Sequence, residues 1–476
     1  MNSTTYYIIS ALLVILVLAG INLMSKPKLS VKGNLLSICA VLCALILTAV
    51  NYEIRDGAVL LALGIGGLGG LFLASKTQMI SMPQVVALLN GLGGLASACV
   101  ALSTFILPAG FAQEDGNITF SVVAAGASLF IGALTFSGSL IAAGKLARVL
   151  DAKPKKVAGH SFLTFLLLVC IVAGIVMTNV SQKEAILTHQ AGVSSATLLY
   201  VCGIALFSLF LGVLFVMRVG GADMPITISL LNSFSGVAGG IAGMAVGEPL
   251  LICLGGVVGA SGLILTQDMC KAMNRSLRSI LTGATTMSAN PAEKDSTGTA
   301  QADETVLTKE KAIAGLKEAK KVILIPGYGM ALSQAQMNVA KLAETLEKNG
   351  AEVKFAIHPV AGRMPGHMSV LLCEADIPYE KLCMMEDINS EFATCDAAIV
   401  IGANDVTNPA ANTAEGTPIY GMPVLNVSDA PLTIVCNFDL KPGYAGVDNP
   451  LYTAPTTFLM LGDAKESVDE LMAAIG

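Results

Sequence analysis

The sequence predicts a polytopic α-helical membrane bundle followed by an α/β, doubly wound Rossmann-like domain. Only 13% of the 476 residues are charged, against about 25% in a soluble globular chain, and the shortfall lies in the first part. Beyond residue 306, strand and helix patterns alternate, which favours a parallel sheet. We therefore expect a membrane domain over 1–279, a flexible, polar linker over 280–305 and an α/β domain over 306–476.

About nine apolar segments are long enough to cross a bilayer, for which a helix needs roughly 20 residues. The first carries no charged segment before its apolar run and no small-residue cleavage site, so we interpret it as a span and not as a signal peptide. The expected spans are 6–24, 34–51, 57–75, 83–107, 118–143, 162–180, 194–217, 224–246 and 249–269.

Cationic side chains gather in alternate loops, which predicts the orientation of the chain. The opposite loops hold acidic groups such as Glu53, Glu114 and Glu248. The positive-inside rule then places the N-terminus outside and the C-terminal domain in the cytoplasm of a bacterial plasma membrane, in a multi-pass protein. The cations that follow the first, fifth, seventh and ninth spans are Lys26, Lys28, Lys32, Lys145, Arg148, Lys153, Lys155, Lys156, Arg218, Lys271, Arg275 and Arg278.

Two spans repeat one pattern, which predicts a parallel duplication within the bundle. The fourth span opens on 82–94, MPQVVALLNGLGG, and the eighth on 224–236, MPITISLLNSFSG. The register pairs Asn90 with Asn232, and an amide inside a span must find a partner. The pair either holds helices together by hydrogen bonds or lines a proton path. Asp223, just before the eighth span, is either a helix cap or a gate to that path.

Charge and cysteine usage exclude several functions. A net charge of −6 gives no reason to expect nucleic-acid binding. The eleven cysteines are scattered, without a CxxC pair or a Cys/His cluster, so we expect small core residues and no metal site. The spans are rich in Gly, Ala and Ser, which suits either tight helix packing or a conduction path.

A strand followed by a glycine turn opens the α/β domain. The run 322–330, VILIPGYGM, predicts a buried strand ending in Gly327-x-Gly329, with Leu332 in place of a third glycine. We expect the helix after this turn to hold a pyrophosphate at its N-terminus. Strands are expected at 321–325, 352–357, 397–402, 423–427 and 433–437, and helices at 306–319, 333–348 and 464–474.

Two further strand ends carry polar residues where open α/β sheets bind ligands. The first is 358–368, HPVAGRMPGHM, and the second is 402–409, GANDVTNP. No Asp or Glu ends the second strand to bind an NAD ribose, because His358-Pro359 stands there.

These motifs, with GYGMA, GYAGVDNPL and CKAMNRS, resemble the beta subunit of proton-translocating nicotinamide nucleotide transhydrogenase over nearly the whole chain. The resemblance implies a membrane proton-channel domain and an NADP(H)-binding domain on this chain. It also implies an alpha subunit that carries NAD(H) and further membrane helices, in a dimer of heteromers. Hydride would pass directly between the two nicotinamides, coupled to proton entry. The alternative is a membrane transporter or channel gated by a nucleotide-sensing C-terminal domain.

The resemblance also implies the site residues. Asp405 falls beside the nicotinamide and, with Arg363, is the expected catalytic group. The repeated pattern described above supplies the expected proton-path residues, Asn90, Asn232 and Asp223. The expected cofactor-binding positions are Gly327, Tyr328, Gly329, Met330, Ala331, Val360, Ala361, Gly362, Arg363, Met364, Gly402, Ala403, Asn404, Asp405, Lys441, Gly443, Tyr444, Ala445 and Gly446.

The chain departs from the family pattern in two places. Asn437-Phe438-Asp439 stands where the family has Lys-Arg-Ser, the basic pair that grips the 2′-phosphate of NADP. An aspartate there repels a phosphate, so we expect a weakened NADP preference or a phosphate read by Lys441 or Arg363. Asn90 stands where many relatives have a histidine, so the titrating group of the proton path is expected on the partner subunit.

Overall fold

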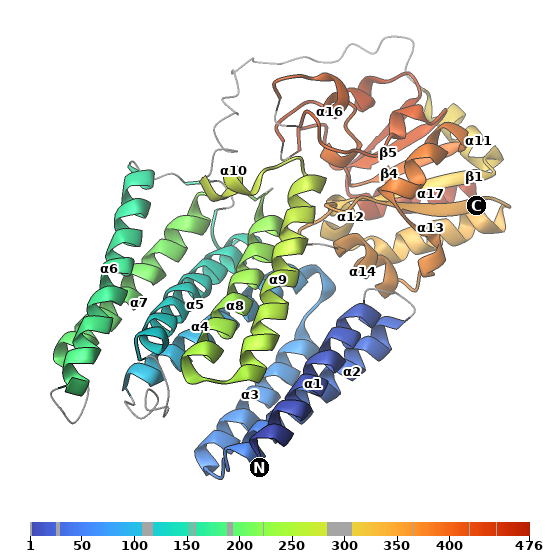
Figure 1. Cartoon of the computed structure of the whole chain (residues 1–476). Helices are drawn as coiled ribbons and strands as arrows, with labels where there is room; N and C mark the ends of the chain where they lie inside the picture. The colour runs from blue at the N-terminus through green and yellow to red at the C-terminus, as the bar shows by residue number, and fades with distance from the viewer. Residues whose placement is uncertain are drawn as a thin grey trace. The chain divides into compact units, whose positions relative to one another are not determined.

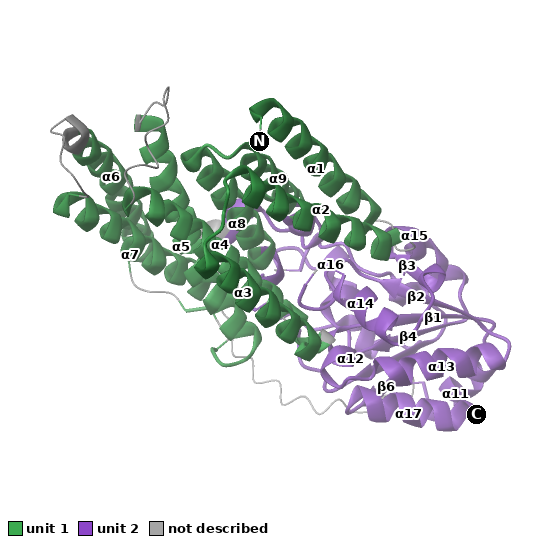
Figure 2. Ribbon diagram, turned by 90° about the horizontal axis from the view of Figure 1, so that it is seen from below, with its two compact units in different colours: residues 1–218, 227–265 green, residues 219–226, 266–476 purple. Residues whose placement is uncertain are grey.

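The computed structural model describes residues 2–24, 29–106, 118–151, 154–155, 159–187, 194–221, 223–282, 307–364, 366–417, 419–443 and 445–476. The chain forms two compact units (Figure 2). Unit 1 comprises residues 1–218 and 227–265, and unit 2 comprises residues 219–226 and 266–476.

Nine helices among the described residues are long and apolar enough to cross a membrane, which confirms the expected spans to within a few residues at each end. A tenth, short helix, α10 (Leu277–Thr282), reaches into the segment expected to be linker. The spans are α1 (Ser3–Met24), α2 (Ser30–Asn51), α3 (Gly57–Lys76), α4 (Met82–Ile106), α5 (Ile118–Leu146), α6 (His160–Leu187), α7 (Ser195–Met217), α8 (Met224–Val246) and α9 (Pro249–Ala272) (Figure 1).

Lys145 corrects one expectation, because the sequence pattern places it in a loop whereas α5 runs on through it. Its side chain is only 2% exposed. The ammonium donates to the carbonyls of Val216 at 3.1 Å and Met217 at 2.9 Å, at the end of α7. The last carbonyls of a helix have no partner within it, so a cation there is stabilising. These two hydrogen bonds explain why a lysine is tolerated inside the bundle.

Each half of the repeated pattern makes a close glycine contact with the helix that follows it. In α4, a Cβ on Gly94 would lie 2.7 Å from the carbonyl oxygen of Gly132 in α5. In α8, a Cβ on Gly236 would lie 2.5 Å from the amide nitrogen of Gly259 in α9. Gly94 and Gly236 follow Asn90 and Asn232 by one helical turn each, so both helix pairs meet backbone to backbone at matching positions.

Unit 2 contains a six-stranded, fully parallel sheet in the order β3-β2-β1-β4-β5-β6, which confirms the doubly wound fold class. The order reverses between β1 and β4, and such a switch point leaves a crevice at the carboxyl ends of the strands. The strands are β1 (Lys321–Pro326), β2 (Glu352–Ile357), β3 (Leu382–Met384), β4 (Ala397–Ile401), β5 (Thr433–Asn437) and β6 (Thr457–Leu461).

The strand expected at 423–427 is wrong. The segment is a buried loop in which Leu425 donates its N–H to the carbonyl of Val406 and packs in the core. An apolar run of this length does not distinguish a strand from a buried loop. The sheet instead gains β3, which has only three residues, and β6, neither of which the pattern predicted.

Helices cover the two faces of the sheet unevenly. One face carries α11 (Lys309–Glu318), α12 (Tyr328–Leu332), α13 (Gln336–Lys348), α14 (His367–Glu374) and α17 (Ala464–Ile475). On the other face, Ile323 and Ile325 of β1 pack against Phe392 and the short helix α15 (Met385–Ile388). A four-residue helix, α16 (Ala410–Thr413), follows the β4 turn.

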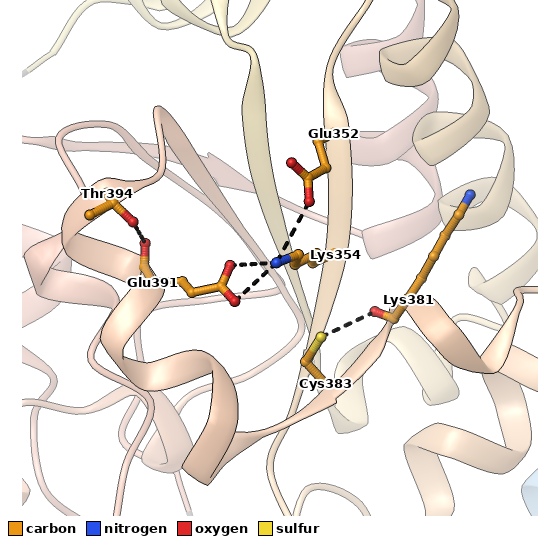
Figure 3. Close-up of polar contacts among 6 residues, drawn as sticks. All are labelled: Glu352, Lys354, Lys381, Cys383, Glu391 and Thr394. Carbon is orange, nitrogen blue, oxygen red and sulfur yellow. Dashed lines mark hydrogen bonds and ion pairs between the residues drawn. The ribbon is translucent and has the colours of Figure 1, made fainter.

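An ion cluster attaches the segment before β4 to strand β2 (Figure 3). The Lys354 ammonium of β2 lies 2.7 and 2.9 Å from the two carboxylate oxygens of Glu391, and 3.6 Å from Glu352. The hydrogen bond to Glu391 raises the pKa of Lys354. Glu391 lies in the segment between α15 and β4, so this cluster fixes that segment to β2 at the amino ends of the strands.

Candidate dinucleotide-binding site

Two turns meet at the switch point of the sheet, one after β1 and one after β4. The N–H of Gly327 donates to the carbonyl of Ile401, and that of Gly329 donates to the carbonyl of Gly402, both at 2.8 Å. A Cβ on Gly327 would lie 2.5 Å from the Cα of Ala403. Gly402 has φ +67°, which favours glycine, and a Cβ there would lie 2.5 Å from the Cα of Gly329. Glycine is therefore required for the two turns to touch.

The helix after the first turn differs from expectation. A five-residue helix, α12, follows Gly327, and the long helix α13 begins only at Gln336. Gln334 between them has φ +51°, a left-handed conformation that ends a right-handed helix. The long helix expected at 333–348 is therefore present as α13, and the unexpected feature is the short helix α12 between it and the glycine turn. Pyrophosphate binding at the start of this helix stays a prediction.

A pocket of about 240 Å³ lies at these turns. Most of the expected binding residues form its walls. They are Gly327, Tyr328, Gly329, Val360, Ala361, Gly362, Gly402, Ala403, Asn404, Asp405, Gly443 and Ala445. The wall also contains residues of unit 2 that the sequence did not predict, namely Gly221, Met273, Arg275, Val406, Ile419 and Met422.

The HPVAGRMPGHM loop is closed by its two histidines. His358 Nε2 donates to the carbonyl of Pro423 at 2.8 Å, while its Nδ1 accepts from the N–H of Val360. His367 Nδ1 accepts from the N–H of Arg363 at 3.1 Å. Burial lowers the pKa of both histidines to about 4, and the Arg363 charge adds to the effect at His367. Both rings are therefore neutral at pH 7.

Arg363 leans over an aromatic ring. Its guanidinium carbon lies 4.5 Å from the ring centroid of Tyr328, a cation–π contact. Gly362 has φ +106°, and a Cβ there would lie 2.5 Å from His367 Nδ1. The loop therefore brings Arg363 beside the glycine turn of β1.

Asp405 is fixed to the GYAG loop. Its Oδ2 accepts from the N–H of Ala445 at 3.0 Å, and a Cβ on Gly443 would lie 2.5 Å from its Oδ1. Asn404 donates to the carbonyl of Lys441 at 3.0 Å and its side-chain oxygen accepts from Asn449. These bonds hold the β4 turn and the loop after β5 together around a carboxylate that lines the pocket.

The unusual segment 437–439 divides into a structural and an exposed part. The Asn437 side chain is buried and donates to the carbonyl of Ala403 at 2.9 Å and to the hydroxyl of Tyr452 at 2.7 Å. Phe438 is 79% exposed. Asp439 lies 3.5 Å from the Lys441 ammonium, so the two charges offset each other beside the pocket.

Several expected binding residues do not line the pocket. Met330 and Ala331 are buried in α12, because their side chains complete the core beneath the turn. Met364 is half-buried, Lys441 is exposed, and Gly446 takes a turn conformation with φ +68°. Tyr444 lies outside the described residues.

The expected proton-path residues have different surroundings. Asn90 is buried in α4 and donates to the carbonyl of Ile228 in α8 at 3.3 Å, one turn before the half-buried Asn232. Asp223 is 5% exposed and lies 3.8 Å from the guanidinium of Arg275. The bond from Asn90 to backbone is that of a residue that holds two helices together.

Sequence reasoning missed Met273 and Arg275 as pocket residues, although their CKAMNRS motif was visible. Asn274 between them donates to the carbonyl of Tyr420 at 2.8 Å, which attaches this segment to the loop that holds Ile419. The motif contributed to the family resemblance, but only the tertiary contact shows that its residues lie in the pocket wall.

Apolar helices long enough to cross a membrane, together with a pocket at the switch point of a parallel sheet, define the broad class of this protein, a membrane protein with a Rossmann-like domain. The chain matches the family model described as "NAD(P) transhydrogenase beta subunit" over residues 3–474. It is 40% identical over 474 residues to "NAD(P) transhydrogenase subunit beta" of Rhodospirillum rubrum, with 98% of each chain covered, and equally similar to the protein of that name from a defined strain of the species. The chain therefore belongs to the NAD(P) transhydrogenase beta-subunit family.

Membership carries three consequences. The chain is part of an NAD(P) transhydrogenase enzyme, its work involves nicotinamide nucleotides, and an alpha subunit is its partner. With its nine apolar helices among the described residues, it is a multi-pass membrane protein.

Proposed function

We propose that this chain binds NADP(H) in the pocket of unit 2 and exchanges hydride with NAD(H) on an alpha subunit, coupled to proton movement across the membrane. The observation that carries the proposal is the pocket itself, whose wall includes four loops at the carboxyl ends of the parallel strands, those after β1, β2, β4 and β5. The membrane bundle in the same chain supports the coupling.

The pocket residues fit a nicotinamide dinucleotide by their chemistry. The wall combines glycine and small apolar residues with two charged groups, Asp405 and Arg275. A bound dinucleotide supplies the hydride chemistry, for which the protein needs no acid or base. The chain's own residues bind and orient it. Asp405, fixed by the N–H of Ala445, is the proposed orienting group, and Arg363 over Tyr328 is the proposed second catalytic residue.

The test uses the chain co-expressed with its alpha subunit and reconstituted in vesicles that hold a pH dye. We expect NADH-dependent reduction of an NADP analogue together with a nucleotide-dependent pH change. Nucleotide-dependent proton flux without hydride exchange would contradict the proposal and match the transporter gated by a nucleotide sensor.

Asp405 is tested by replacement with the isosteric amide. Asp405→Asn keeps the shape of the side chain and removes its charge. We expect the activation barrier to rise by about 1–3 kcal/mol, so that turnover falls, with little change in nucleotide affinity. Asp429→Asn, the same change on an exposed carboxylate that does not line the pocket, is the control. Unchanged turnover in Asp405→Asn would return the residue to a purely structural role.

The proposal extends to the proton path, the orientation and the assembly. Asn90, Asn232 and Asp223 contribute to the path, with the titrating group on the alpha subunit. The C-terminal domain lies in the cytoplasm, and the enzyme is a dimer of heteromers. Asn232→Leu should block proton pumping in vesicles but leave nucleotide binding intact. Normal pumping in that variant would make the asparagine a packing residue.

A further inference from the structure

Three polar side chains from distant parts of unit 1 meet at one end of the bundle, where α1 begins, α2 ends and α8 turns into α9. The hydroxyl of Tyr6 donates to Oε1 of Glu248 at 2.5 Å, and that of Tyr52 donates to Oε2 at 2.6 Å. The two rings lie 6.3 Å apart, edge to face. Each oxygen of one carboxylate therefore has its own phenol donor.

These contacts suit a carboxylate as the shared acceptor. Hydrogen bonds from hydroxyl to carboxylate at such distances are charge-assisted and roughly twice as strong as neutral ones. Glu248 also accepts from the N–H of Leu250 at 3.2 Å, in the first turn of α9, where a negative charge is stabilised. Tyr6 is 3% exposed, so its buried hydroxyl would lose this close acceptor if the carboxylate were removed.

The turn that Glu248 occupies belongs to a tightly packed helix pair. A Cβ on Gly255 of α9 would lie 2.5 Å from the Cα of Gly240 in α8. Ser233 of α8 donates to the carbonyl of Gly259 at 2.7 Å. Because close-packed backbones of this kind do not slide independently, fixing the turn fixes α8 as a whole, including the polar face near Asn232.

We propose that Glu248 is a positioning residue that, through Tyr6 and Tyr52, sets the place of the α8–α9 pair against the N-terminal helices and so keeps proton movement coupled to hydride transfer. The coupling part rests on the proposed function. A carboxylate is suited to this role because one group accepts from two donors on two different helices, which an apolar contact cannot do.

The experiment uses the complete enzyme in vesicles and measures protons moved per hydride transferred. Glu248→Gln keeps the size and removes the charge, so we expect this ratio to fall several-fold, on the order of tenfold, because both charge-assisted bonds weaken. Tyr6→Phe with Tyr52→Phe should give the same loss, and the triple variant no further loss. Glu53→Gln is the matched control, since Glu53 is an exposed carboxylate in the connection that follows Tyr52.

A purely structural anchor would lower the amount of assembled enzyme and leave the ratio per molecule unchanged, and that result overturns the proposal. A second readout does not depend on turnover. In thermal unfolding of the purified complex, the Glu248 and tyrosine changes must be non-additive, and strict additivity overturns the proposal as well. Absence of hydride exchange in the unaltered enzyme contradicts the proposed function instead, while the unfolding cycle still decides the contact.

Discussion

Glycine serves different purposes in the two units, and the difference shows what a glycine-rich sequence can reveal. In unit 1, Gly94 and Gly255 bring straight helices together, so the backbone keeps its ordinary helical conformation. In unit 2, Gly327 and Gly402 bring two turns together, and Gly402 also takes a left-handed conformation. The first kind of glycine can be exchanged for another small residue at a moderate cost. The second cannot, because the facing turn leaves no space for a Cβ at either glycine, and at Gly402 φ also disfavours a side chain.

The largest effect is expected at Gly402. Gly402→Ala places a Cβ against the backbone of Gly329 and imposes strain at φ +67°, so we expect a destabilisation of about 2–4 kcal/mol and loss of nucleotide binding. Thermal unfolding and nucleotide titration of the purified chain measure this. Gly416→Ala, at a similar φ but in open space, is the control and should cost about 1 kcal/mol. Equal effects would mean that φ alone matters.

Acid should affect the two units differently. His358 and His367 are neutral in the folded protein, with pKa values lowered from 6.5 to about 4, so the unfolded chain binds more protons between these values. Their stability contribution is complete above about pH 6.5 and is lost as the pH falls toward 4, at up to about 1.4 kcal/mol per pH unit for each.

The measurement is urea unfolding of the fragment 306–476 between pH 7 and 5, which also tests whether the domain folds alone. His358→Gln should remove about half of the slope. In unit 1, the Asn90 and Ser233 contacts do not titrate in this range. An undiminished slope in both His358→Gln and His367→Gln would assign the acid sensitivity to other groups.

A membrane glycine should have a smaller effect that depends on its neighbour. Gly255→Ala meets the backbone of Gly240, so we expect a loss of about 1–3 kcal/mol, measured by thermal unfolding in detergent. Gly66→Ala is the matched control, because nothing lies within 4 Å of its Cβ position in α3. If the control is equally destabilised, a partner outside this chain covers α3.

The last effect concerns nucleotide choice and leaves stability unchanged. Asn437 is held inward by two hydrogen bonds, so the variant should keep it and change only its exposed neighbours. Phe438→Arg with Asp439→Ser adds a cation and removes an anion, which should raise the preference for NADP(H) over NAD(H) by about 1–3 kcal/mol. Calorimetric titration with both nucleotides checks it. No gain would mean that another residue already reads the 2′-phosphate.

The sequence predicted what depends on local pattern. The nine spans, the strands at 321–325 and 352–357 and the turn at Gly327 all follow from runs of apolar residues and glycine spacing. It failed where a tertiary contact decides. Leu425 lies in an apolar run but pairs with a loop, and β3 is too short to show periodicity. The direction of Asn437 depends on Tyr452, fifteen residues away, and no local pattern records that.

The candidate site also combines residues that a local pattern predicts with residues that only tertiary contacts bring in. Residues in the glycine turns and strand ends were predicted, because parallel strands bring their carboxyl ends together in any such sheet. Met273 and Arg275 come from a segment just after the last membrane helix, and only the folded chain places them in the pocket wall.

Lys145 offers a chemical reporter of the bundle. Its amine is covered and bonded to two carbonyls of α7, whereas lysines such as Lys271, at 80% side-chain exposure, face solvent. An amine-reactive label should therefore modify the exposed lysines at once and reach Lys145 only when α5 and α7 separate. Mass spectrometry of that single residue, followed through turnover, would show whether these two helices part during the catalytic cycle or remain joined throughout.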